Sequence, residues 1–198
     1  MWIYEKKLEF PINIKKTDPK LATTIMTQYG GPNGELAAAL RYLSQRYTMP
    51  TGMSKAVLND IGTEELAHLE MVATIIYQLT QNAEGEDFYN STAAALYSKW
   101  DGGIHPDDSG TVPFTSAYIN TMGRDWLADL HEDLAAEQKA RATYEYLLDF
   151  TKDPEVVAPL AFLRQREIIH FQRFGEILDD LQFNDSIRKT HFIKGIEK

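Results

Sequence analysis

The segment EELAHLE, residues 64–70, places Glu65 and His68 in what otherwise reads as the buried stripe of a helix. Residues seven positions apart lie on one face of an α-helix, and the rows containing these two side chains are otherwise apolar. Burying a carboxylate or an imidazole without a partner costs more free energy than helix propensity recovers, so something must bind this pair. The apolar neighbours are Leu58, Val72 and Leu79 in the row of Glu65, and Ile61 and Ile75 in the row of His68.

The same layout recurs towards the C-terminal end of the chain. Glu167 and His170 again interrupt two apolar rows and again lie three residues apart. At that spacing the two side chains share one helix face and reach a common ion, which is how helical bundles hold pairs of metal ions. The apolar neighbours are Leu160, Phe174 and Leu181 in the first row, and Leu163 and Ile177 in the second.

Each Glu-x-x-His pair is also preceded, at a matched distance, by a further glutamate and a tyrosine. One Glu-x-x-His pair is weak evidence, because common residue types produce it by chance. Two copies with matched upstream residues are strong evidence for a site built from four helices. The pattern Glu-x6-Tyr-x22-Glu-x2-His occurs twice, offset by 102 residues: Glu35, Tyr42, Glu65 and His68, then Glu137, Tyr144, Glu167 and His170.

The proposed ligands are carboxylates and imidazoles, and the chain has no cysteine. Oxygen and nitrogen ligands without sulfur favour iron or manganese over copper(I), with zinc less favoured, and they do not choose between iron and manganese. Two such ions can exchange two electrons with a small oxidant or assist displacement at phosphorus. The apolar surroundings and the lack of basic groups for a phosphate favour the oxidant.

Helical periodicity predicts four long helices and therefore an all-α fold. Three glycines and a proline in YGGPNG must interrupt any helix that precedes the first of them. The helical period fades between the second and third helices, in residues 82–121, where a Gly-, Pro- and Asp-rich loop is expected at 99–114. Two short connections and one long crossover describe a ferritin-like four-helix bundle. The helices are expected at residues 33–47, 53–81, 122–150 and 155–183.

The chain is expected to divide into three parts. Residues 1–17 alternate loosely between apolar and polar, which suits an extended arm lying on the body or on a neighbouring subunit. Residues 18–183 form the dimetal bundle, beginning at TDPK with Thr17 or Asp18 as the helix cap. Residues 184–198 form a polar tail.

Charge and hydropathy limit the partners and the location. The net charge of −9 would repel a phosphate backbone or an anionic lipid surface, so we expect no nucleic acid and no membrane partner. No apolar run approaches the length of a signal peptide core or of a membrane span, which needs about 18 residues. A cytoplasmic location is the expectation.

Three segments carry a resemblance to a known family: GELAAALRYLSQRY at 34–47, IGTEELAHLEM at 61–71 and REIIHFQRFGE at 166–176. They resemble the manganese catalases, over roughly residues 18–183, and among them the short chain most resembles the catalase-like coat protein of bacterial spores. The resemblance implies conversion of hydrogen peroxide to water and dioxygen at a centre of two manganese ions. It also implies a homo-oligomer, a hexamer in the family, and other spore coat proteins as partners, with the spore coat as a second expected location.

The resemblance also implies a role for each site residue. The spacing of Glu167 suggests that it binds metal as Glu65 does. The resemblance implies instead that Glu167 is not a ligand but an outer-sphere acid and base near the solvent bridge. Tyr42 would be hydrogen-bonded to the site. The metal ligands would be Glu35 and His68 on one ion, Glu137 and His170 on the other, and Glu65 as the bridge.

One position departs from the family pattern. Ala136 stands where some members have an arginine, which removes a positive charge beside the site and leaves the catalytic efficiency open. Tyr144 is expected to pack in the core, and the remaining histidines, His105, His131 and His191, are expected at the surface.

Two other functions remain open from the residues alone. A ferritin-like di-iron oxidase or peroxidase would use the same ligand types. A mainly structural coat protein would use its metal site only to fasten four helices together.

Overall fold

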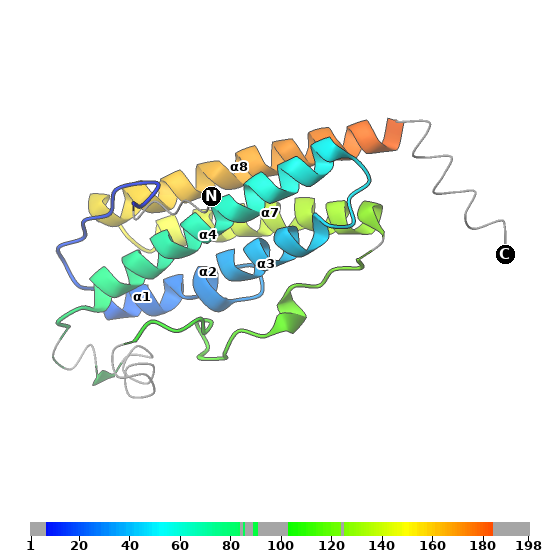
Figure 1. Ribbon diagram of the computed structural model, residues 1–198. Helices are drawn as coiled ribbons and strands as arrows, with labels where there is room; N and C mark the ends of the chain where they lie inside the picture. The colour runs from blue at the N-terminus through cyan, green and yellow to red at the C-terminus, as the bar shows by residue number, and fades with distance from the viewer. Residues whose placement is uncertain (1–6, 84, 86–88, 91–102, 124, 184–198) are drawn as a thin grey trace.

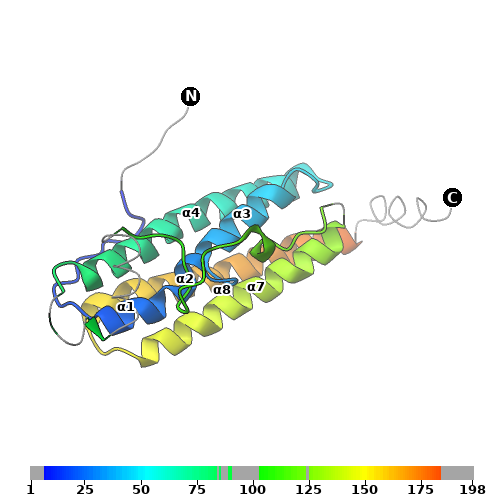
Figure 2. The ribbon, with the colours of Figure 1, turned by 90° about the horizontal axis from the view of Figure 1, so that it is seen from below.

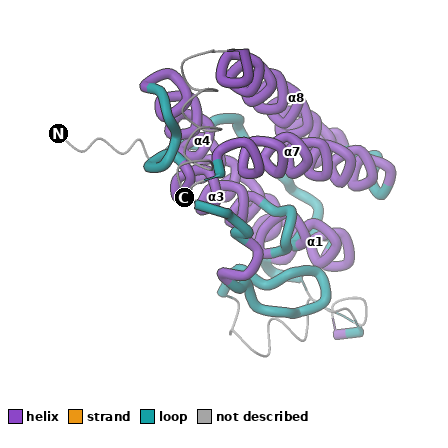
Figure 3. The backbone as a smooth tube through the Cα atoms, turned by 90° about the vertical axis from the view of Figure 1, so that its right-hand side faces the viewer, coloured by secondary structure: helices purple, strands orange, loops and turns teal. Residues whose placement is uncertain are grey.

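The computed structural model describes residues 7–83, 85, 89–90, 103–123 and 125–183. Within these residues the regular structure is helical and no strand occurs, apart from one isolated bridge between Asp107 and Pro113 (Figure 3). The all-α prediction is confirmed. The elements are α1 (Pro19–Ile25), α2 (Thr27–Gly30), α3 (Glu35–Gln45), α4 (Gly52–Thr80), a 3-10 turn η1 (Ser116–Tyr118), α7 (Trp126–Asp149) and α8 (Pro154–Phe183).

The four long helices form a bundle of two antiparallel hairpins. Helix α3 packs mainly on α4 and α7 mainly on α8, and α4 contacts α8 between the hairpins. The colours of Figure 1 show that α4 and α7 run in the same direction. The end of α4 and the start of α7 therefore lie at opposite ends of the bundle, and residues 103–123 of the connecting segment pass along its outside (Figures 1 and 2). This long crossover is the one that a ferritin-like bundle requires.

Side-chain caps set most of the helix starts. The Asp18 carboxylate accepts a hydrogen bond from the backbone N–H of Leu21, which selects Asp18 over Thr17 as the cap of α1. Thr51 and Ser54 form a reciprocal capping box at the start of α4. These contacts satisfy backbone N–H groups that the first helical turn leaves without partners.

The third long helix begins four residues later than the sequence predicts, at Trp126. The Asp125 side chain caps it by accepting from the N–H of Ala128. Asp129, in the first turn, accepts hydrogen bonds from the Met122 N–H at 2.7 Å and the Thr121 hydroxyl at 3.2 Å. These bonds hold the preceding residues outside the helix, so periodicity alone placed the start too early.

Two glycines allow close approach between segments. A Cβ atom at Gly62 would lie 2.9 Å from the Leu43 side chain, so glycine lets α4 pack tightly on α3. A Cβ atom at Gly30 would lie 2.3 Å from the backbone of Pro106, which shows that the crossover packs directly against the end of α2. The crossover is further fixed by Arg41, which is buried and donates to the carbonyls of Tyr118 and Ile119.

The described part of the N-terminal segment lies on the bundle. Ile14 is buried, and its N–H donates to the Gln78 side chain at 2.7 Å. The Phe10 and Phe162 rings lie 5.1 Å apart between centroids. The segment is therefore attached to both α4 and α8. Residues 1–6, the tail at 184–198 with its His191, and residues 91–102, which include the first part of the expected loop, lie outside the described residues.

The core consists of two apolar clusters with a polar layer between them. One cluster contains Met71, Val72 and Leu79 of α4 with Leu160 and Leu163 of α8. The other contains Leu58 and Ile61 of α4 with Phe174, Ile177 and Leu181 of α8. The seven-residue rows predicted from the sequence are buried at every position, and the Glu-x-x-His pairs lie where the two clusters meet. Among the described residues, no helix is both long enough and apolar enough to cross a bilayer.

Candidate metal centre

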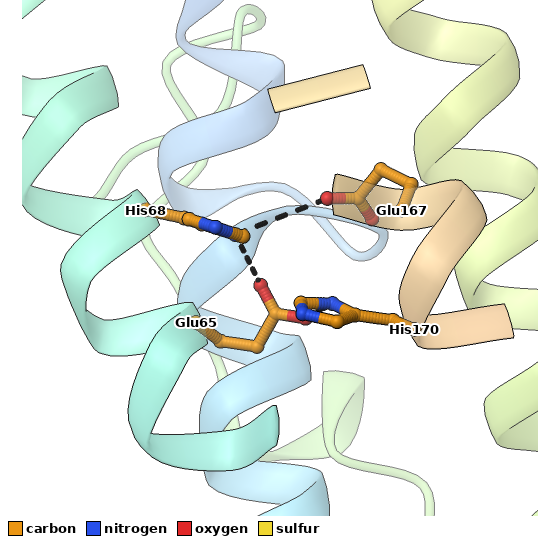
Figure 4. A group of neighbouring side chains, drawn as sticks. All are labelled: Glu65, His68, Glu167 and His170. Atoms are coloured by element: carbon orange, nitrogen blue, oxygen red, sulfur yellow. Dashed lines mark hydrogen bonds and ion pairs between the residues drawn. The ribbon is translucent and has the colours of Figure 1, made fainter. Parts of the chain in front are cut away.

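Two long helices present the polar layer from opposite sides. Figure 4 shows Glu65 and His68 projecting from α4 towards Glu167 and His170 of α8. None of the four side chains is more than 2% exposed. One donor atom from each lies within 4.8 Å of the others, so the group could hold a metal ion.

One half of the site is formed by His68, Glu65 and Glu35. The His68 Nδ1 atom lies 2.9 Å from Glu65 Oε2 and 3.7 Å from Glu35 Oε2. Glu35 is the first residue of α3 and is 2% exposed. One nitrogen and two carboxylate oxygens, all from the hairpin of α3 and α4, therefore lie close together in this half of the site.

The other half repeats this arrangement with residues of the second hairpin. The His170 Nδ1 atom lies 2.8 Å from Glu65 Oε1 and 3.6 Å from Glu137 Oε2. The two oxygens of Glu65 thus face two different histidines, each with its own second carboxylate. The grouping is the one that the family resemblance implies, with Glu65 in the middle.

Two tyrosines hold the outer carboxylates across the bundle. The Tyr42 hydroxyl of α3 donates to Glu137 of α7, and the Tyr144 hydroxyl of α7 donates to Glu35 of α3. Both rings are fully buried. Tyr144 packs in the core, as expected, and its hydroxyl also reaches the site, because the upstream glutamate of the other hairpin lies directly opposite it.

Glu167 lies at the edge of the first half. Its Oε1 atom is 3.9 Å from His68 Nδ1, farther than either Glu35 or Glu65, and has no hydrogen-bond partner among the described residues. Burial, followed by the charges of Glu35 and Glu65, raises the pKa of Glu167 well above its ordinary value.

Divalent cations fit this set of atoms. The buried atoms without a hydrogen-bond partner include Glu65 Oε1, Glu137 Oε2 and His170 Nδ1, all of which face the space between the helices. Glu65 Oε1 and His170 Nδ1 are 2.8 Å apart without hydrogen-bond geometry. Ligands of one cation lie about 3 Å apart when each is about 2.1 Å from it. Buried polar atoms normally have partners, and cations would provide them here.

The electrostatics of the metal-free protein agree with a cation site. Burial and then the charge of Glu65 raise the pKa of Glu35 to about 8, despite the nearby His68. Burial also opposes ionisation of Glu65, but His170 and His68 outweigh it and lower the pKa of that carboxyl. Crowded carboxylates therefore retain protons that metal ions would replace.

A further layer of residues was not predicted from the sequence. Glu64 faces the outer Nε2 atoms of both histidines, at 3.5 Å from His68 and 3.3 Å from His170. The Arg166 Nε atom donates to Glu64 Oε1 at 2.5 Å. Each of these residues immediately precedes a glutamate of the repeated pattern, and they are separated by 102 residues, the offset of the repeat. The shared offset of 102 residues and the opposite charges of Glu64 and Arg166 are the sequence signal that predicts this pair.

One alanine and two histidines singled out in the sequence lie outside the proposed ligand set. Ala136 is 5% exposed and directly precedes Glu137 in α7. His105 in the crossover and His131 in α7 are exposed, as predicted.

Comparison with known proteins agrees with the geometry. The model of the family described as manganese containing catalase matches residues 1–198. Protein CotJC of Bacillus subtilis (strain 168) is 49% identical over 182 residues, covering 92% of this chain and 95% of CotJC. A probable manganese catalase of Clostridium acetobutylicum is 35% identical over 186 residues, covering 92% of this chain and 81% of that protein.

A solved structure supports the same relationship. KatB, a manganese catalase from Anabaena, matches with a TM-score of 0.84 and 35% identity, over 93% of this chain and 83% of KatB. A thioferritin from Bacteroides fragilis matches with a TM-score of 0.57 and 16% identity, which supports the ferritin-like fold alone. The sequence repeat, the paired Glu-x-x-His helices and these matches agree, and the chain belongs to the family of manganese-containing catalases.

Proposed function

We propose that this chain converts hydrogen peroxide to water and dioxygen with Glu35 and His68 holding one manganese ion, Glu137 and His170 the other, and Glu65 bridging them. Two manganese ions, when bound, supply the two electrons that reduce one peroxide to water and recover them from a second, which leaves as dioxygen. The overall change is two hydrogen peroxide molecules to two water molecules and one dioxygen.

One observation carries this proposal. The two oxygens of Glu65 each lie within 2.9 Å of an Nδ1 atom, His68 on one side and His170 on the other. A carboxylate serving a single ion would not need histidines on both sides. The arrangement supports two neighbouring ions, as two-electron chemistry on a small oxidant requires.

Glu167 is the residue best suited to move protons. Cleavage of the peroxide O–O bond needs a proton on the leaving oxygen, and oxidation of the second peroxide releases protons to the site. The raised pKa of Glu167, due first to burial, favours a protonated carboxyl that can donate. Its Oε1 atom has no competing hydrogen-bond partner among the described residues.

The other side chains keep the site rigid and dry. Tyr42 and Tyr144 orient the carboxylates of Glu137 and Glu35 by donating hydrogen bonds to them. The apolar clusters on both sides restrict water, which strengthens electrostatic interactions within the site.

Oxygen release measured together with metal content tests the proposal. Protein expressed with manganese and iron both available should retain two manganese ions per chain and release one dioxygen for every two hydrogen peroxide molecules consumed. Iron loading, with iron oxidation and no dioxygen, would favour the di-iron oxidase instead. Bound metal without turnover would favour a mainly structural role.

We also propose that the chain forms a homo-oligomer, a hexamer by family resemblance, in the cytoplasm and in the spore coat with other coat proteins. Tyr146, in the last turn of α7, and Phe150, which follows the helix, are 65% and 68% exposed, which supports an interface. Light scattering of the purified protein should give the mass of six chains. The mass of a single chain would contradict the assembly.

A further inference from the structure

A single carboxylate faces the outer nitrogens of both histidines. The Oε1 atom of Glu64 is 3.5 Å from His68 Nε2, and its Oε2 atom is 3.3 Å from His170 Nε2. The two rings are stacked, with centroids 5.5 Å apart and 20° between their planes. Glu64 therefore stands beside the pair in a position to accept from both rings.

The chemistry of metal-binding histidine requires such an acceptor. The Nδ1 atoms of His68 and His170 face Glu65, so those atoms must be free of hydrogen to bind a cation. The hydrogen of each neutral ring is then on Nε2. Both Nε2 atoms are buried and have no partner with hydrogen-bond geometry among the described residues. A small closure from 3.3–3.5 Å towards the usual distance of about 2.9 Å would satisfy both through Glu64.

Arg166 holds Glu64 in this position. Its Nε atom donates to Glu64 Oε1 at 2.5 Å, and the guanidinium is partly buried. The positively charged guanidinium lies directly against the Glu64 carboxylate. A charged acceptor makes stronger hydrogen bonds than a neutral one.

The N-terminal segment adds a second acceptor on one side only. Glu9 Oε2 lies 3.5 Å from His68 Nε2, and the Glu9 side chain is 32% exposed. No comparable contact with His170 is present among the described residues. Glu64 is thus the acceptor that the two halves of the site share.

We propose that Glu64 is a positioning residue that orients both metal-binding histidines through their Nε2–H groups, and that Arg166 fixes Glu64. Glu64 acts through the histidines and contacts neither metal nor peroxide. This inference rests on the proposed metal assignment. It goes beyond that assignment because one carboxylate, Glu64 held by Arg166, would orient the histidines of both halves of the site.

Manganese binding by the full-length protein tests this role. Glu64→Gln offers one acceptor instead of two and should raise the manganese Kd about 10–100-fold. Glu70→Gln, the same change at an exposed position of α4, should leave the Kd unchanged. Arg166→Lys keeps the charge but loses the planar donor and should raise the Kd by a smaller factor. Arg166→Lys also decides the question if Glu64→Gln does not fold.

A spectroscopic measurement separates positioning from a general loss of stability. In zinc-loaded protein with 15N-labelled histidine, both Nε2–H protons should be visible and protected from exchange. Glu64→Gln should remove the protection of at least one ring, and Glu70→Gln of neither. An unchanged Kd together with two protected protons in Glu64→Gln would overturn the inference. Failure of the wild-type protein to bind two manganese ions would instead overturn the proposed function on which it rests.

Discussion

Tyr144, on α7, donates a hydrogen bond to the carboxylate of Glu35, on α3, across the centre of the bundle. The reverse contact runs from Tyr42 of α3 to Glu137 of α7. Each hairpin therefore supplies one outer carboxylate and the phenol that orients the carboxylate of the other hairpin. The crossed pair couples the two halves of the metal site and explains why the tyrosines belong to the repeated pattern.

Removing either phenol should weaken metal binding. Tyr144→Phe and Tyr42→Phe each leave a buried carboxylate without its donor, and a hydrogen bond to a charged group contributes about 1.5–3 kcal/mol. We expect a manganese Kd raised about 10-fold or more in each, measured by equilibrium dialysis. Tyr146→Phe, on the exposed face of α7, serves as the control. Equal Kd values for all three variants would show that the crossed bonds do not support the site.

Glu167→Gln should separate catalysis from metal binding. The amide keeps the shape but cannot exchange a proton, so two manganese ions should remain bound while kcat falls about 10²–10⁴-fold. Metal analysis and oxygen release on the same sample measure both effects. Glu176→Gln, an exposed change on α8, should alter neither. Loss of one manganese ion from Glu167→Gln would instead identify Glu167 as a ligand, the symmetric arrangement suggested by its spacing.

Manganese affinity should rise with pH. Burial, followed by the charge of Glu65, raises the pKa of Glu35 to about 8 in the metal-free protein. Below that pH the carboxyl is protonated, and the metal must displace the proton. The contribution of Glu35 should therefore increase affinity up to about pH 8 and level off above it. Calorimetry at pH 7 in buffers of different ionisation enthalpy should show protons released on binding, and proton uptake would contradict this account.

The contact between Lys15 and α8 should weaken when one carboxylate is neutralised. Glu155 accepts hydrogen bonds from the Lys15 N–H and from its Nζ, each at 2.8 Å. These bonds, the side-chain bond first, lower the pKa of Glu155, so the stability that this contact contributes is complete above the ordinary pKa and is lost as pH falls through the lowered value. Glu155→Gln should speed hydrogen exchange of the Lys15 amide at neutral pH, whereas Glu132→Gln should not. Identical exchange in both variants would show that the contact contributes nothing.

Much of the site could be predicted from the sequence because helical periodicity is local. Rows at seven-residue spacing place Glu65 beside Leu58 and Val72 on one face regardless of tertiary structure, and the second Glu-x-x-His pair shows which helix must lie opposite. The presence of a long crossover could be predicted for the same reason, since the period fades after α4.

The contacts between site residues of different helices could not be predicted, because they depend on how the helices pack against one another. Periodicity shows that Tyr144 is buried but not that Glu35 lies across from its hydroxyl, since this depends on the register between hairpins. Glu64 and Arg166 look like ordinary surface charges until α4 and α8 are packed side by side. The position of Glu9 depends on the path of an irregular segment, for which the sequence carries no periodic signal.

Anomalous scattering at the manganese edge, from crystals of protein grown with manganese and iron, is the sharpest test of whether the bundle holds two manganese ions. We expect two manganese peaks, one beside Glu35 and His68 and one beside Glu137 and His170, with the Glu65 carboxylate between them. A single peak, or two peaks only at the iron edge, would contradict this expectation.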